Sequence, residues 1–244
     1  GEGFFQKAFS PFVAGVYAGD AETLSLADAF PRLQAAEAQH GSLLGALWKQ
    51  RKAHRPRILS FKNGMEALPR ALAQALPAQS CWLSTRVKSL NLPQRMLELE
   101  GPQGSWQTRF DALVLALPAH ALSNLQTFPE KAFDFAHQVY YPPLTVAYLG
   151  YARHQVAHPL DGFGFLAAHH EPCEVLGALF PTSVFEGRAP EDCVSFTCFI
   201  GGAKHPARAH APDALHHAHQ ALSRILGIRG QPIMQRLHRW GPDH

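Results

Sequence analysis

At 244 residues the chain is long enough to bury a substantial hydrophobic core and to form one large or two small domains. Apolar residues make up 46% of it and charged residues 17%, and no apolar run approaches the roughly 18 residues of a membrane-spanning helix. The net charge of +3 is too small to indicate nucleic-acid binding, and no RNP, zinc-knuckle or helix-turn-helix pattern accompanies it. No basic segment followed by an apolar region opens the chain, so we expect a cytoplasmic polypeptide.

The residues from 4 to 30 predict a helix broken near Ser10-Pro11, a glycine-rich turn, and a second short helix that starts after Thr23 or Ser25. Gly15 and Gly19 lie on either side of this turn. Each glycine in a helix interior costs about 1 kcal/mol, so two of them so close together favour a turn over a continuous helix.

A further helix is predicted over residues 31–52, with Pro31 in its first turn and Gly41 as an interruption. It ends in five cations, and two interpretations stay open. The cations can be the solvated end of a helix, or they can place the helix on an anionic membrane surface. The cations are Lys49, Arg51, Lys52, Arg55 and Arg57.

Downstream, the patterns alternate between helix and strand. The run 112–117 is continuously apolar, which is typical of a strand buried on both faces of an α/β sheet. Gly227 is placed to end the last helix. We predict helices over 65–76, 130–138 and 213–226, and strands over 84–92, 96–100, 110–117, 144–151, 193–200 and 232–240.

A hairpin is predicted from two short apolar runs, Phe163–Leu166 and Val175–Phe180, joined by a turn at Glu171-Pro172. The hairpin can be ordinary sheet core. Its glycines, at 162, 164 and 177, weaken a strand unless another backbone or a ligand approaches closely. A flat apolar ligand is therefore one candidate occupant.

The cysteines and histidines give no ligand pattern. Cys81, Cys173, Cys193 and Cys198 lack CxxC spacing and are expected to be mainly buried free thiols. The fifteen histidines lie mostly in polar turns or on one helix face without an HExxH motif, so we expect solvated side chains and no metal site.

Seven segments, in the same order along the chain, resemble the protoporphyrinogen oxidase branch of the flavin-containing amine oxidase superfamily. The resemblance covers almost the whole sequence. The segments are PFVAGVYAGD (11–20), SFKNGMEALPRAL (60–72), FDALVLALP (110–118), YYPPLTVAYLGY (140–151), PLDGFGFL (159–166), LGALFPTSVFEGRAP (176–190) and FIGGAKHP (199–206).

The resemblance implies an α+β fold with a mixed β-sheet substrate domain, an N-terminal helical portion and part of an FAD-binding α/β domain. We expect a helical, membrane- or substrate-associated portion over 1–57, the partial FAD domain over 58–127 and the substrate sheet over 128–244. The implied reaction is the oxidation of protoporphyrinogen IX to protoporphyrin IX, or of coproporphyrinogen to coproporphyrin, in haem biosynthesis. The flavin would carry out the hydride chemistry, so no catalytic side chain is named.

The same resemblance implies binding residues. Gly15 matches a position that approaches the substrate, and Leu166 and Phe180 match aliphatic and aromatic residues that clamp the macrocycle. Val87 matches a strand position whose backbone meets the FAD adenine, and Trp240 matches a tryptophan that leads toward the flavin-contacting segment.

The sequence also departs from that family, because no GxGxxG follows an N-terminal strand and no C-terminal glycine-rich flavin segment is present. We therefore expect the central part of a longer enzyme, inactive alone. The alternatives are another flavin amine oxidase-type enzyme and a non-catalytic tetrapyrrole-binding module. The expected partner is a tetrapyrrole, and peripheral binding to the inner face of a membrane and a homodimer are left open.

Overall fold

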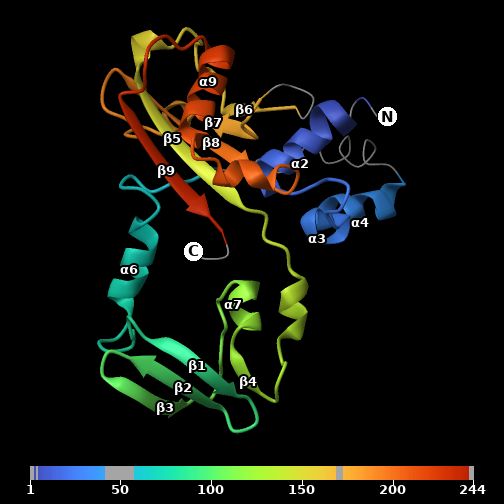
Figure 1. Cartoon of the computed structure of the whole chain (residues 1–244), viewed down its shortest axis with the longest axis vertical. Helices are drawn as coiled ribbons and strands as arrows, with labels where there is room; N and C mark the ends of the chain where they lie inside the picture. The colour runs from blue at the N-terminus through green and yellow to red at the C-terminus, as the bar shows by residue number, and fades with distance from the viewer. Residues whose placement is uncertain (1–2, 4, 42–57, 169–172, 242–244) are drawn as a thin grey trace. The chain divides into compact units, whose positions relative to one another are not determined.

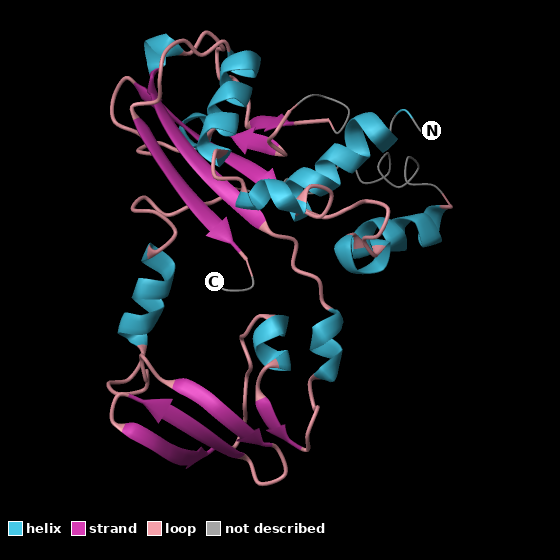
Figure 2. Cartoon of the chain, in the orientation of Figure 1, coloured by secondary structure: helices cyan, strands magenta, loops and turns pink. Residues whose placement is uncertain are grey.

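The computed structural model describes residues 3, 5–41, 58–168 and 173–241 of the chain. It contains two compact units. Unit 1 comprises Gly1–Lys62 and Pro142–His244, and unit 2 comprises Asn63–Tyr141. Each unit combines helices with a β-sheet of its own (Figure 2), so the fold is α+β, as predicted. How the expected functional domains map onto these units stays a prediction.

Unit 1 is built on a five-stranded sheet in the order β6-β7-β8-β5-β9, with every described pairing antiparallel (Figure 1). Its strands are β5 (Leu144–Ala152), β6 (Gly164–Leu166), β7 (Gly177–Leu179), β8 (Cys193–Gly201) and β9 (Met234–Trp240). Its helical segments are η1 (Phe5–Phe9), α2 (Ser10–Tyr17), α3 (Leu26–Ala29), α4 (Pro31–His40), η3 (Arg153–Gln155), α8 (Pro181–Val184), η4 (Pro206–His210) and α9 (Ala214–Leu226).

The core of unit 1 lies between α9 and one face of this sheet. Strand β8 alternates between buried and half-buried residues, as a strand with one covered face should, and Phe196 and Cys198 point into the core. The apolar stripe of α9 is rich in alanine, which allows a close approach to the sheet. Gly227 ends this helix with φ +64°, as predicted.

Unit 2 contains a four-stranded sheet in the order β3-β2-β1-β4, in which β1–β3 form an antiparallel meander and β4 is parallel to β1. Its elements are α6 (Ala67–Ala75), β1 (Arg86–Asn91), β2 (Met96–Gly101), β3 (Gly104–Arg109), α7 (Ala119–Ser123), β4 (Gln126–Phe128) and η2 (Asp134–Gln138). Only Leu90, Leu99 and Ala136 are buried apolar residues in this described unit.

Most of the predicted elements are confirmed within a few residues, but one predicted strand is wrong. Residues 110–117 form no strand, and Val114 is 88% exposed. A strand buried on both faces needs neighbouring strands and covering helices, and unit 2 supplies neither to this segment. The strand that forms instead is β3, immediately upstream.

The N-terminal helices differ from expectation in their boundaries. The predicted break near Ser10-Pro11 coincides with the change from the π-helix η1 to α2 at Ser10, and Pro11 lies in the first turn of α2. The turn begins only at Ala18, whose φ is +52°. Ser25 caps α3 by accepting the amide of Asp28 at 3.3 Å. Helix α4 ends at Gly41, and the predicted basic cluster Lys49–Arg57 lies outside the described residues. Within the described ranges no helix is long and apolar enough to cross a bilayer.

Candidate functional site

The face of the unit 1 sheet opposite α9 is an apolar surface set out by the strand register. Directly paired residues project from the same face, so Leu166, Gly177 and Phe199 form one row across β6, β7 and β8. Gly164, Leu179 and Thr197 form the next row. Leu166 is 45% exposed and Leu179 37% exposed, so this face is left uncovered by the core helix.

Two of the hairpin glycines are explained by close backbone contact between β6 and β7. Gly164 has φ +154°, and a Cβ there would collide with the carbonyl oxygen of Ala178. A Cβ on Gly177 would lie 2.5 Å from the carbonyl oxygen of Phe165. Gly162 has open space around it. Close approach of the neighbouring backbone therefore explains Gly164 and Gly177 without a ligand. Because Gly177 has no side chain, the row on the open face is lowered between Leu166 and Phe199.

Helix α2 forms the wall that faces this surface. Phe12, Gly15 and Val16 share one helix face at i, i+3, i+4 spacing. Gly15 lies inside the helix, not in the expected turn, and a Cβ there would overlap Cδ2 of Leu166. The glycine therefore lets α2 approach the hairpin as closely as a bare backbone allows.

Aromatic contacts also join α2 to the segment between α3 and α4. Phe30, between α3 and α4, packs against Phe9, Phe12 and Tyr17, with the Tyr17 ring edge-on at 5.2 Å between centroids. The Tyr17 hydroxyl donates to the carbonyl of Ala29 at 3.2 Å. The short helices α3 and α4 thus brace α2 against the sheet.

The turn after α2 is fastened to the loop after β8. The amide of Ala203 donates to the carbonyl of Ala18 at 2.7 Å, and Lys204 forms an ion pair with Asp20 at 3.2 Å. Gly202, with φ +78°, lies so close that a Cβ would be 2.9 Å from the Ala18 oxygen. Two of the segments that carried the sequence resemblance, 11–20 and 199–206, therefore meet at this turn.

Between α2 and the open sheet face lies a cavity of about 620 Å³. Its size falls within the range of small-molecule sites, which are usually apolar with few polar groups. Among the described lining residues, Tyr17 alone carries a polar side-chain group, and that hydroxyl is already bonded. The cavity is lined by Phe12, Gly15, Val16, Tyr17, Ala18, Leu144, Phe163, Gly164, Phe165, Leu166, Leu176, Gly177, Ala178, Leu179 and Phe199.

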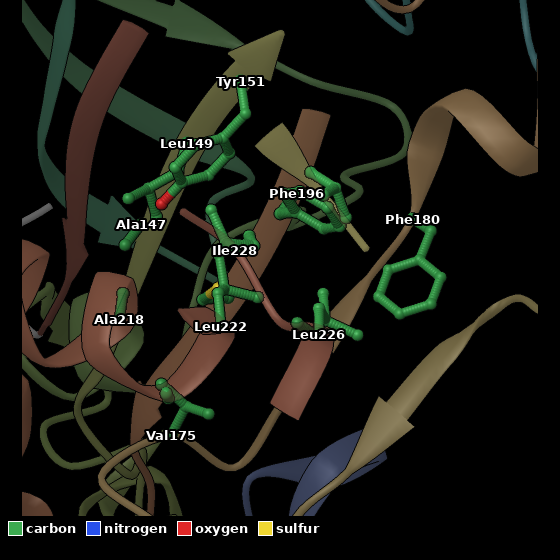
Figure 3. Close-up of a cluster of buried hydrophobic side chains, with 14 of the residues drawn as sticks. Ala147, Leu149, Tyr151, Val175, Phe180, Phe196, Ala218, Leu222, Leu226 and Ile228 are labelled. Atoms are coloured by element: carbon green, nitrogen blue, oxygen red, sulfur yellow. The ribbon is translucent and has the colours of Figure 1, made fainter. Parts of the chain in front are cut away.

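The structure brings Gly15 and Leu166 together in the wall of this cavity, but it places Phe180 elsewhere. Phe180 is 2% exposed and packs against Phe196 at 5.5 Å between ring centroids, with Phe165 and His158 around it. Figure 3 shows its ring among the buried side chains of the core. This differs from the expected position against a ligand. The physical reason is strand alternation: Leu179 points to the open face, so its neighbour Phe180 points to the core.

Leu179 and Phe199 are two of the lining residues that sequence reasoning missed. Period-two alternation could have found them, because Val194, Phe196, Cys198 and Ile200 mark the buried face of β8 and leave Phe199 on the other.

The two residues expected to contact the cofactor lie in different units. Val87 is a half-buried residue of β1 in unit 2, paired with Leu99 next to a register shift that precedes Ser89. Trp240 ends β9 in unit 1, is 55% exposed and packs edge-on against His238 at 4.5 Å. Trp240 pairs with Leu144, so it projects from the same sheet face as that cavity residue.

Groups with shifted pKa values lie outside this cavity. Burial raises the pKa of the Tyr151 hydroxyl and of the Cys198 thiol, both in the core. Burial also lowers the pKa of His219, whose Nδ1 is 2.9 Å from the Tyr151 oxygen, and that of His205 near Arg208. The cavity thus provides shape and apolar contact, and no residue in its wall is assigned a proton-transfer role.

A second cavity, of about 580 Å³, lies in unit 2 beside β1, α7 and η2, and its mixed wall includes Glu130, Lys131 and Asp134. In the described part of the chain no three histidine, cysteine, aspartate or glutamate side chains group as metal ligands would. Cys173 and Cys198 are buried free thiols, Cys193 is half-buried and Cys81 is exposed.

The family model for flavin containing amine oxidoreductases matches residues 1–244. The chain belongs to this family. Among relatives, it is 27% identical to a chloroplastic protoporphyrinogen oxidase 1 of Spinacia oleracea, over 95% of this chain and 48% of that protein. It is 22% identical to a coproporphyrinogen III oxidase of Bacillus subtilis, over 98% of this chain and 53% of that protein. The chain thus spans about half the length of these relatives.

A solved structure from Exiguobacterium sp. 255-15 shares the fold. It superposes with a TM-score of 0.76 at 22% identity and covers 96% of this chain and 51% of that one.

Membership of the family implies a flavin cofactor. A dinucleotide is held by a glycine-rich turn that leads from a strand into a helix N-terminus. Among the described residues no such turn is found. The closely spaced glycines Gly162 and Gly164 lead into strand β6 and not into a helix. The described residues therefore do not fit the pyrophosphate of a dinucleotide.

Proposed function

We propose that this chain forms the substrate-binding part of an FAD-dependent oxidase that acts on a porphyrinogen, protoporphyrinogen IX or coproporphyrinogen III. The observation that carries the proposal is the cavity between α2 and the open sheet face, with its almost wholly apolar wall. A porphyrinogen is a broad apolar disc, and aliphatic and aromatic side chains such as Leu166, Leu179 and Phe199 can pack against its face. The relatives named above support the same substrate class.

In this proposal the chain binds, orients and shields, and the flavin supplies the two-electron oxidation when it is bound. Helix α2 and the hairpin, which touch at Gly15 and Leu166, form two walls of the cavity that would receive the disc. The Ala203–Ala18 hydrogen bond and the Lys204–Asp20 ion pair fasten the turn after α2 to the loop after β8, and so fix the position of α2 against the sheet. The apolar wall offers water few hydrogen-bonding partners, so an apolar ligand would displace that water at little cost.

The direct test is a titration of the chain with protoporphyrin IX and coproporphyrin III, followed by the Soret absorbance band. We expect saturable binding, weakened about tenfold by Leu166→Ala through the loss of apolar contact of about 1.4 kcal/mol. The matched control is Leu72→Ala, which removes an exposed leucine in unit 2. Absence of porphyrin binding would instead favour an amine oxidase-type substrate.

The cofactor proposal has its own test. We propose FAD as the flavin of the full enzyme, with Val87 and Trp240 as contributors, and we expect this chain alone to bind FAD weakly and not to turn over. Titration of FAD, followed by flavin fluorescence, measures this. Stoichiometric binding at sub-micromolar concentration would contradict the expectation.

Membrane association is a further proposal, which rests on the sequence of residues 49–57 and lies outside the described part of the structure. Co-sedimentation with anionic vesicles at low salt should enrich the chain, and replacement of the five cations by glutamine should abolish enrichment. An unchanged distribution would assign the cluster to a solvated helix end. A homodimer is likewise open, and sedimentation analysis measures it.

A further inference from the structure

The open face of the unit 1 sheet continues past the cavity to the edge strand β9 (Figure 1). The row that begins at Leu179, in the cavity wall, passes through Thr197 on β8 and Tyr148 on β5. It ends at Arg236 on β9, which pairs directly with Tyr148. Directly paired residues project from the same face, so this row changes along its length from an aliphatic side chain, through two hydroxyl groups, to a guanidinium.

The guanidinium at the end of this row is available to a ligand. Arg236 is exposed, and Tyr148 beside it is 39% exposed. Within the described part of the chain, no carboxylate forms an ion pair with Arg236 and its guanidinium makes no hydrogen bond. A positive charge without a partner in the described chain thus lies on the same sheet face as the apolar cavity.

A second arginine on β9 shows what the opposite face does with such a charge. Arg239 pairs with the buried residue Thr145, so it projects from the face that α9 covers. Its Nη2 donates to the carbonyl of Ala211 at 3.2 Å. The two arginines are three residues apart on one strand, and Arg239 is bonded within the chain whereas Arg236 is directed to the open face.

The separation between Arg236 and the cavity suits a broad ligand. Neighbouring strands lie about 4.8 Å apart, so three strand spacings place the backbone of Arg236 about 14 Å from that of Leu179. An arginine side chain is long enough to reach back over the neighbouring strand β5. A tetrapyrrole that packs against Leu179 and Phe199 would extend along this face in the direction of β5 and β9.

The chemistry of the two ends of the row matches the two edges of one such ligand. Protoporphyrinogen IX carries both of its carboxylates on one edge and only apolar substituents on the opposite edge. The cavity wall is almost wholly apolar, and burial of a carboxylate there without a partner would be costly. A guanidinium, in contrast, can bind a carboxylate through two parallel hydrogen bonds.

We propose that Arg236 is a specificity-determining residue that binds a carboxylate of the tetrapyrrole and so orients the disc. The carboxylate edge then lies toward β9, and the apolar edge lies in the cavity beside α2. The Tyr148 hydroxyl, at the paired position, can donate to the same carboxylate. This inference rests on the proposed function, because it concerns the same ligand in the same site.

The test compares protoporphyrin IX with its dimethyl ester, each titrated into the whole chain and followed by the Soret band. The ester keeps the disc and the apolar edge but carries no charge. The quantity measured is the ratio of acid affinity to ester affinity. We expect Arg236→Gln to lower this ratio about fivefold, because an ion pair at an exposed site is modest in strength, and to leave the ester affinity unchanged.

The matched control is Arg239→Gln, which removes the same charge from the same strand on the opposite face. Its ratio should equal that of the wild-type chain. Arg236→Lys should lie between wild type and Arg236→Gln, because an ammonium keeps the charge but not the two-bond geometry. An unchanged ratio in Arg236→Gln, or an equal fall in Arg239→Gln, would overturn the proposal.

A second variant covers a failure of Arg236→Gln to fold. Arg236→Met keeps a long side chain without the charge and should lower the ratio by the same factor, and an unchanged ratio would again overturn the proposal. The wild-type titration separates this inference from the proposed function. No saturable binding of either porphyrin would overturn both, whereas binding that Leu166→Ala weakens and Arg236→Gln leaves unchanged would overturn the role of Arg236 alone.

Discussion

The two sheets of this chain differ in how completely each is covered. The five-stranded sheet of unit 1 has α9 on one face and keeps a large set of buried apolar residues, among them Leu149, Phe196 and Leu222. The four-stranded sheet of unit 2 buries Leu90 and Leu99, and its amphipathic helix α6 leaves Leu68, Leu72 and Leu76 43–60% exposed. An antiparallel sheet with its own helix is self-sufficient, whereas an apolar stripe without a partner contributes little stability.

The largest expected effect is a difference in stability loss between matched leucine substitutions in the helices of the two units. Leu222→Ala, in α9, should destabilise unit 1 by about 2–5 kcal/mol, because it removes a fully buried side chain and leaves a cavity. Leu72→Ala, with the same chemistry on α6, should cost less than about 0.5 kcal/mol. Urea unfolding followed by far-UV circular dichroism measures both. Similar losses for the two variants would show that α6 is packed as tightly as α9.

The next effect concerns the β6–β7 contact. Gly164→Ala should destabilise the sheet by about 1–3 kcal/mol, because φ +154° is strained for alanine and its Cβ meets the Ala178 oxygen. Gly162→Ala, two residues earlier in open space, is the control and should change stability by less than about 0.5 kcal/mol. A tolerated Gly164→Ala substitution, judged by the urea midpoint, would mean that the strands can separate without cost.

The sequence predicted most of unit 1 because its signals are local. Alternation in 144–151 and 193–200, the helical stripe ending at Gly227 and the paired hairpin runs each report a face that is buried within the chain itself. The run 110–117 failed for the opposite reason. A continuously apolar strand needs neighbouring strands and covering helices, and unit 2 provides neither for this run. The apolar pattern is therefore present in the sequence, but no strand forms.

The candidate site was predicted in part. Leu166 and Gly15 lie in the cavity wall, whereas Phe180 was chosen by residue type, and strand alternation turns it toward the core. Two contacts could not be anticipated, because they join segments more than 120 residues apart. They are the ion pair between Asp20 and Lys204 and the hydrogen bond from Arg188 to Ser60. Such pairs are set by tertiary packing, which no local pattern encodes.

A smaller effect should follow pH in unit 1. The pKa of His219 is lowered, first by burial and then by repulsion from His216, and that of His205 is lowered by burial and by Arg208. The unfolded chain therefore binds more protons in the window between the lowered values and about 6.5. Stability is fully present above that window and falls as pH drops through it.

Urea midpoints at about pH 7.5 and about pH 5.5 measure this loss. His219→Gln should reduce the difference between the two midpoints, since the glutamine amide can still hydrogen-bond with the Tyr151 hydroxyl without titrating. The exposed neighbour Gln220→Ala is the control and should retain the wild-type difference. A difference that persists unchanged in His219→Gln would place the proton uptake elsewhere.

The central claim, that the open sheet face of unit 1 binds a porphyrin, is tested most directly at two adjacent residues with opposite orientations. Leu179→Ala should weaken protoporphyrin IX binding about tenfold with little loss of stability, because Leu179 lines the cavity and is 37% exposed. Phe180→Leu should lower the urea midpoint and leave the affinity of the folded protein nearly unchanged, because its ring lies in the core. Tight binding by Leu179→Ala, together with lost binding by a folded Phe180→Leu, would contradict the claim.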